Sequence, residues 1–362
     1  MNREQRIAYL RTAITKRVLV IDGAMGTMIQ REKLGESDFR GQRFASHSHE
    51  LRGNNDVFVL TRPEMIEKIH GAYLEAGADI VETNSFSSTR VAQADYQLES
   101  VVYEMNVAAA EVARRAADAW TLRTPDRPRL VAGAMGPTNK TLSMSPKVTD
   151  PGYRAITFNE MRDAFAEQVR GLIDGGCDLL LAETAIDTLS LKACLVAIEE
   201  VLSEKKLRLP VMVSGTITDK SGRILSGQTL DAFYTSIAHA RPFSVGLNCG
   251  GGATQVRPYM AELASLANCY VSCYPNAGLP NTFGGYDETP NLTAGLIREM
   301  AEAGLLNIVG GCCGTTPDHI RAIAEAVKGI NPRRPQQPPA MLSNPASAIS
   351  RMRREVRSGL SS

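Results

Sequence analysis

The stretch Gly175-Gly-Cys-Asp-Leu-Leu-Leu-Ala-Glu183 combines a helix end, a buried strand and a carboxylate within nine residues. The two glycines suit the left-handed turn that commonly ends a helix before the chain reverses. The apolar run after Asp178 has no polar alternation, which is typical of a strand buried on both faces. Glu183 then lies at the carboxyl end of that strand, where parallel α/β proteins gather their functional groups.

The same kind of apolar run recurs along the chain, with amphipathic helical segments between the runs. The eight runs cover residues 18–22, 79–83, 129–134, 178–183, 210–214, 244–248, 270–273 and 306–310. Eight strands alternating with helices predict a single-domain (β/α)₈ TIM barrel over residues 1–330. Residues 331–362 begin with a Pro-rich linker and end in a basic segment, for which we expect no fixed structure.

The composition excludes several classes of protein. The net charge of +1 across 362 residues gives no general electrostatic reason to expect a nucleic-acid or membrane partner. The polar N-terminus leads into no long apolar segment, so the sequence predicts a cytoplasmic protein. Seven cysteines, an odd number, fit a disulfide framework poorly and favour metal binding or catalysis.

Three of these cysteines follow predicted strands and adjoin glycine, namely Cys249, Cys312 and Cys313. Three thiolates around Zn²⁺ leave a fourth position open, as catalytic zinc sites require. Ordinary burial is the alternative, because free cysteine is among the most buried residue types. The adjacent pair argues against it, since neighbours on a strand face opposite sides. Packing roles are expected for the remaining cysteines in the barrel: Cys177, Cys194, Cys269 and Cys273.

Polar groups at the other strand ends suggest what such a metal site would bind. Carboxylates at Asp22 and Glu183 suit an ammonium group, and glycine-rich backbone at these strand ends suits a carboxylate. Zinc suits a thiol, because the metal lowers the pKa of the bound thiol and holds it as a nucleophilic thiolate. The rim therefore predicts alkyl transfer to the sulfur of a small zwitterionic thiol. The further substrate-binding candidates at these strand ends are Gly23, Thr83, Asn84 and Asn248.

Several motifs resemble the homocysteine-binding domain of cobalamin-dependent methionine synthase over residues 10 to 330. They are Ile21-Asp-Gly-Ala-Met-Gly-Thr-Met-Ile-Gln30, Gly53-Asn-Asn-Asp56, Glu82-Thr-Asn84, Gly246-Leu-Asn-Cys249, Pro275-Asn-Ala-Gly-Leu-Pro280 and Gly310-Gly-Cys-Cys-Gly-Thr-Thr-Pro317. The resemblance implies a (β/α)₈ barrel, zinc held by the three cysteines, and homocysteine converted to methionine. It also implies that Asp22 and Glu183 contact the substrate amine, with Gly23, Thr83 and Asn84 near its carboxylate.

The sequence departs from that family after residue 329, where neither a folate barrel nor cobalamin-binding modules follow. We therefore expect a separate cobalamin- and folate-binding partner subunit to supply methylcobalamin, although a chain cut from a longer one is also consistent. A homocysteine methyltransferase that uses a small donor, such as S-methylmethionine or betaine, is the alternative enzyme. The non-enzymatic alternative is a zinc- or redox-sensing protein, for which the strand-end carboxylates have no use.

Overall fold

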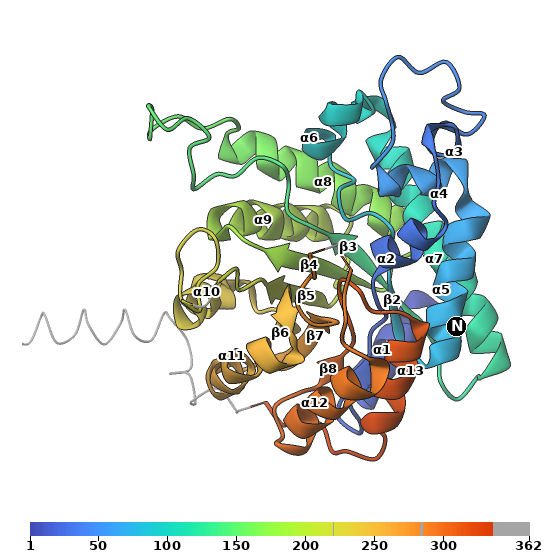
Figure 1. The fold of residues 1–362 in the computed structure, drawn as a ribbon, viewed down its shortest axis with the longest axis vertical. Helices are drawn as coiled ribbons and strands as arrows, with labels where there is room; N and C mark the ends of the chain where they lie inside the picture. Colours follow the sequence, from blue (N-terminus) through green and yellow to red (C-terminus); the bar gives the residue numbers. More distant parts are fainter. Residues whose placement is uncertain (220, 283–284, 336–362) are drawn as a thin grey trace, which may run out of the picture.

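The computed structural model describes residues 1–219, 221–282 and 285–335. Eight parallel strands form one sheet in the order β1-β8-β7-β6-β5-β4-β3-β2 (Figure 1). A bridge between Ile21 and Ile80 joins the first strand to the second and closes the barrel. The strands are β1 (Leu19–Val20), β2 (Ile80–Glu82), β3 (Leu130–Met135), β4 (Leu179–Ala185), β5 (Val211–Gly215), β6 (Ser244–Gly252), β7 (Tyr270–Asn276) and β8 (Ile308–Val309). The predicted (β/α)₈ barrel is confirmed, and each strand overlaps a predicted run.

A helix follows every strand and together these helices surround the barrel (Figure 1). They are α5 (Pro63–Ala76), α7 (Val102–Arg123), α8 (Phe158–Asp174), α9 (Thr188–Glu204), α10 (Leu230–Ile237), α11 (Ala253–Leu266), α12 (Pro290–Glu302) and α13 (Pro317–Ala326). The other helices, with 3₁₀ helices labelled η, are α1 (Arg3–Ala13), α2 (Met25–Arg31), α3 (Glu36–Arg40), η1 (Asn55–Val57), α4 (Phe58–Thr61), α6 (Arg90–Gln93), η2 (Ala94–Tyr96), η3 (Glu99–Val101) and η4 (Ala238–Ala240). Among the described residues, no helix combines the length and apolarity needed to cross a membrane.

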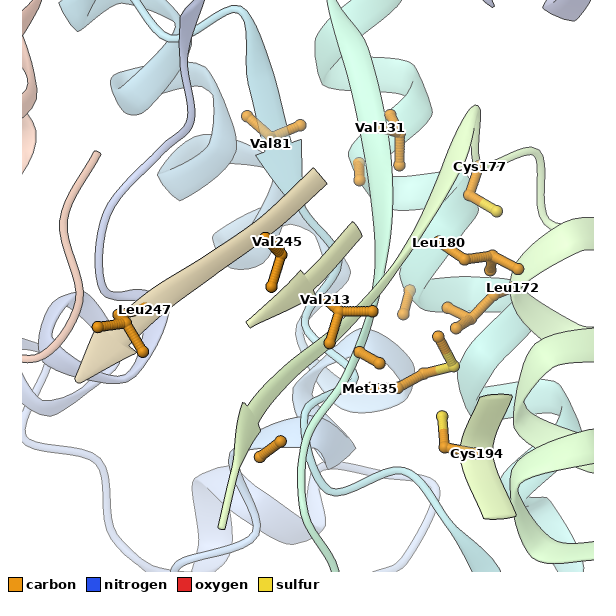
Figure 2. Close-up of a cluster of buried hydrophobic side chains, with 14 of the residues drawn as sticks. Val81, Val131, Met135, Leu172, Cys177, Leu180, Cys194, Val213, Val245 and Leu247 are labelled. Atoms are coloured by element: carbon orange, nitrogen blue, oxygen red, sulfur yellow. The ribbon is translucent and has the colours of Figure 1, made fainter. Parts of the chain in front are cut away.

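The apolar residues of the barrel form two layers. The outer layer lies between the strands and the ring of helices, and Figure 2 shows part of it, including Val131, Leu180 and Val213. Cys177 and Cys194 belong to this layer and are buried, as expected. The inner layer fills the barrel itself and comprises Leu19, Ile21, Ile80, Leu130, Ala132, Leu179, Leu181, Met212, Tyr274 and Ile308. Continuous apolar runs are therefore explained by burial on both faces of each strand.

Helix α1 closes the amino end of the barrel. Its side chains Leu10, Ala13 and Ile14 are buried in the same cluster as the inner layer. Buried carboxylates fix this end of the sheet: Asp79 binds Arg17 and Arg127, and Asp178 binds Arg6 and Arg114. Each carboxylate is fully buried but paired with two guanidinium groups, which offsets the cost of removing its charge from water.

The chain beyond α13 remains attached to this amino end as far as the structure describes it. The Arg333 guanidinium donates hydrogen bonds to the backbone carbonyls of Ala264, Ala267 and Cys269, and only 6% of the residue is exposed. The rest of the predicted linker and tail, residues 336–362, lies outside the described residues.

Candidate functional site

The strand pairing of the barrel is irregular at the carboxyl ends of two strands, β4 and β6. The pairing of β4 with β5 shifts register between Ala182 and Ala185, and that of β6 with β7 shifts between Asn248 and Gly252. Within these irregular segments Thr184 and Cys249 have left-handed backbone angles, with φ of 55° and 57°. Such angles cost non-glycine residues about 1–2 kcal/mol each. Bulges of this kind re-aim side chains and occur next to functional sites.

The three predicted metal ligands lie together at this end of the barrel. The Sγ atom of Cys313 is 3.9 Å from that of Cys249 and 4.0 Å from that of Cys312, and all three thiols lie within 4.8 Å of one another. Tetrahedral zinc with Zn–S bonds near 2.3 Å requires S···S distances of about 3.8 Å. The spacing and the soft donor atoms therefore fit a zinc ion.

Other groups around the thiols support the same interpretation. Hydrogen bonds from the Cys312 and Cys313 thiols lower the pKa of Cys249, and the same contacts raise the pKa of Cys312, so Cys249 is the member of the cluster that loses its proton most readily. Asn276, at the end of β7, also hydrogen-bonds Cys249. Its buried Oδ1 atom has no hydrogen-bond partner in the part of the chain that the structure describes. An unsatisfied oxygen on a side chain that hydrogen-bonds Cys249 is a further available ligand atom.

A cavity of about 370 Å³ opens next to the thiols and is lined by four carboxylic acids. Asp22, Glu82 and Glu183 come from the ends of β1, β2 and β4, and Asp56 accepts hydrogen bonds from the Ser87 backbone N–H and the Ser88 hydroxyl. No Lys, Arg or His is found among its described lining residues. The cavity thus offers acidic groups with no described basic group beside them, and a cationic ligand would favour their ionised form.

The three strand-end carboxyls have few hydrogen bonds of their own. Asp22 Oδ2 accepts the Glu82 backbone N–H at 3.1 Å, whereas the buried Asp22 Oδ1 has no partner among the described residues. Burial raises the pKa of all three groups above the ordinary range, to about 8 for Glu183. Mutual repulsion raises it further for Asp22 and Glu82. Buried acceptors without partners point to a hydrogen-bond donor that is not part of this chain.

The remaining predicted substrate residues differ in their placement. Gly23, Thr83 and Asn84 line the cavity. A Cβ atom at Gly23 would lie 2.8 Å from Tyr73 and from Thr315, so this position requires glycine. Asn248 is not among the described residues that line the cavity, and its side chain hydrogen-bonds Thr184 and Cys312.

Sequence reasoning did not select Glu82, Asn276 or Tyr286, all of which lie at the site. Glu82 and Tyr286 line the cavity, and Asn276 hydrogen-bonds Cys249. Tyr286 comes from the loop between β7 and α12, and its ring covers Gly314, where a Cβ atom would lie 2.3 Å away. The signal for Glu82 was available, because it ends a predicted strand. The loop that carries Tyr286 has no such pattern.

A sequence comparison assigns the family. Residues 19–327 match the family described as homocysteine S-methyltransferase. The chain belongs to the homocysteine S-methyltransferase family. Among solved structures, this methyltransferase fold is similar to the oxidized form of the homocysteine methyltransferase MmuM from Escherichia coli, with 22% identity and a TM-score of 0.67. That match covers 90% of this chain and 99% of MmuM. The metallated form of MmuM matches with 23% identity and a TM-score of 0.65, over 88% of this chain and 99% of MmuM.

The carboxyl cluster predicts how the stability of this methyltransferase depends on pH. The pKa of Glu82 is raised in the folded protein, so protonated Glu82 contributes to the free energy of unfolding. That contribution is complete below the unfolded-state pKa near 4.5 and is lost as the pH rises through the folded-state pKa. We expect Glu82→Gln to match the wild type at pH 5 and to exceed it at pH 8, by up to about 1.4 kcal/mol for each pH unit that separates the folded and unfolded pKa values. Urea unfolding of the ligand-free proteins at both pH values measures this. Parallel pH profiles for the two proteins would contradict it.

Proposed function

We propose that this chain is a zinc-dependent homocysteine S-methyltransferase that makes methionine, as one barrel of a divided methionine synthase. The observation that carries the proposal is a single cavity that joins three thiols to three buried carboxyls. A thiol-binding metal and an ammonium-binding cluster are the two features that homocysteine requires. We also propose residues 1–330 as the catalytic unit, 331–362 as a linker and tail, and the cytoplasm as its location.

Cys249, Cys312 and Cys313 would hold the zinc ion. When bound, a zinc ion with three thiolate ligands supplies an open position that lowers the pKa of a thiol. The chain places these ligands at the cavity wall nearest Glu183, whose carboxyl interacts electrostatically with Cys249. The homocysteine sulfur would therefore lie on the thiol side of the cavity, and its amino group on the carboxyl side.

The carboxyl cluster suits the substrate ammonium group in number as well as in charge. An ammonium group has three N–H donors, and Asp22, Glu82 and Glu183 supply three separate acceptors with little internal hydrogen bonding. We propose that each accepts one N–H of homocysteine. Gly23, Thr83 and Asn84, which line the same cavity, would lie near the substrate carboxylate.

Methylcobalamin on a partner protein is the proposed methyl donor. The cavity of about 370 Å³ accommodates a small amino acid but not a corrin ring as well, so a corrin would have to approach from outside. The segments that follow β2, β3, β4, β5 and β7 each expose a large apolar side chain, as a docking face for such a carrier would. These residues are Phe86, Val148, Leu189, Leu225 and Leu279.

A small cationic donor is the second candidate, supported by the charge of the cavity. S-methylmethionine carries a sulfonium and betaine a quaternary ammonium, and a lining with four carboxyls and no described cation attracts either. The structural similarity to MmuM is compatible with both candidates because it concerns the fold.

Methionine formation from homocysteine distinguishes these functions. We expect the zinc-loaded protein to make methionine fastest with methylcobalamin bound to a cobalamin-binding protein module, and slowly with free methylcobalamin, because a docked carrier aligns the methyl group with the sulfur. Equal or faster turnover with S-methylmethionine or betaine would overturn the proposed donor. No methionine with any of the four donors would favour a zinc- or redox-sensing protein.

A further inference from the structure

The two left-handed residues at the site come from strands that are not neighbours. Thr184 belongs to β4 and Cys249 to β6, and β5 lies between these strands. The gap is bridged by one side chain, Asn248, which is 1% exposed. The Asn248 side chain therefore joins the two irregular segments, and it also contacts the thiol of Cys312.

The Asn248 amide uses all of its hydrogen-bonding groups within the protein. Its Oδ1 atom accepts the Thr184 backbone N–H at 3.0 Å, and its Nδ2 atom donates to Thr184 Oγ1 at 2.8 Å and to Cys312 Sγ at 3.8 Å. A backbone N–H can only donate, so the contact with Thr184 N–H fixes which end of the amide is the oxygen. The NH₂ group must then face the hydroxyl and the thiol.

Thr216, the residue after β5, stabilises this arrangement with two further hydrogen bonds. Thr216 Oγ1 donates to the Asn248 carbonyl at 3.0 Å, and the Thr216 backbone N–H donates to the Ala185 carbonyl at 3.1 Å. The same residue thus holds the backbone on both sides of the link. The hydrogen bonds around Asn248 stabilise backbone angles that Thr184 and Cys249 would not otherwise favour.

The left-handed angle of Cys249 also explains how two consecutive residues serve one cluster. Side chains alternate along a regular strand, so Asn248 and Cys249 would point to opposite faces. Instead the Asn248 amide contacts Cys312, and the Cys249 thiol lies 3.9 Å from that of Cys313. A change in the backbone at 249 would therefore move a metal ligand.

We propose that Asn248 is a positioning residue that fastens β4 to β6 and orients Cys249 and Cys312 for the metal. Through Nδ2 it donates a hydrogen bond to the Cys312 sulfur, and through Thr184 it holds the irregular end of β4 next to Glu183. This role rests on the proposed metal site, and it is independent of the methyl donor. Outer partners of metal ligands of this kind typically change metal affinity by about 10–100-fold.

Transfer of zinc to a coloured chelator tests the contact with the metal ligand. We expect Asn248→Ala and the isosteric Asn248→Asp to release zinc about 10–100-fold faster than the wild type. Asn307→Ala is the matched control: Asn307 is equally buried, accepts the Val271 backbone N–H and donates to the Arg333 carbonyl, but lies at the opposite end of the barrel. It should release zinc at the wild-type rate.

A second variant separates the two parts of the role and remains informative if Asn248→Ala folds poorly. Glycine adopts left-handed angles without strain, so Thr184→Gly combined with Asn248→Ala should regain part of the lost stability in urea unfolding, while zinc release stays fast. If the double variant is no more stable than Asn248→Ala, the proposed stabilisation of the Thr184 backbone by Asn248 is wrong. Wild-type release rates in both Asn248 variants, or equally fast release from Asn307→Ala, would overturn the proposal. A wild-type protein that binds no zinc would instead overturn the proposed function.

Discussion

Alanine at Cys249, Cys312 or Cys313 is expected to abolish stoichiometric zinc binding and, with it, methyl transfer to homocysteine. The three thiols lie within 4.8 Å of one another, so removing one of them leaves only two thiolates for the ion. Zinc sites contribute about 10–16 kcal/mol from four ligands, which gives about 3 kcal/mol per ligand. Loss of one ligand should therefore weaken zinc binding more than a hundredfold.

Elemental analysis and competition with a chelator measure this effect, and the remaining cysteines supply matched controls. Cys273 is fully buried on β7, and Cys194 is buried on α9, both in the outer apolar layer. Cys273→Ala and Cys194→Ala should lose some stability but retain about one zinc per chain. Full zinc occupancy in Cys313→Ala, or its loss in Cys273→Ala, would show that the ligands have been misassigned.

Glu183→Gln and Asp22→Asn are expected to weaken homocysteine binding by about 10–150-fold while zinc is retained. Each change removes one charge-assisted hydrogen bond to the substrate ammonium group, worth about 1.5–3 kcal/mol. The buried amides that replace the carboxylates preserve the shape of the cavity. Calorimetric titration with homocysteine provides the measurement.

A ligand without the amino group is the control for this prediction. The ligand 4-mercaptobutanoate keeps the thiol and the carboxylate but has no ammonium group. Its affinity should change little in Glu183→Gln, because it never makes the hydrogen bond that this substitution removes. The difference in affinity between the two ligands should therefore narrow in the variants. An equal loss for both ligands would mean that Glu183 acts on the metal or the fold, and unchanged binding of both would give it a structural role.

The barrel was predictable from the sequence because burial on both faces leaves a direct pattern. Every predicted run overlaps a strand, although β1 and β8 are each only two residues long. The inward direction of Glu82 also followed from strand alternation, since Ile80 two residues earlier belongs to the inner layer. The direction of a carboxyl group at a regular strand end is thus predictable from alternation alone.

Irregular backbone was not predictable in the same way. Nothing in Glu183-Thr-Ala or Asn248-Cys-Gly indicates left-handed angles at Thr184 and Cys249, because neither residue type favours them. Alternation places Cys249 on the face opposite to Asn248, whereas its thiol lies 3.9 Å from that of Cys313. The contacts of Asn248 with Thr184 and Cys312 depend on three strands meeting, which no local pattern encodes.

The closure of the barrel floor by α1 dictates the order of events in the proposed reaction. With Leu10, Ala13 and Ile14 packed into the inner layer, the thiols are reached from the carboxyl end of the strands. Homocysteine must therefore enter before a protein-borne donor covers that opening, and methionine stays trapped until the donor withdraws. Initial-rate kinetics should follow a compulsory sequence, in which excess carrier inhibits turnover by occupying the entrance too early.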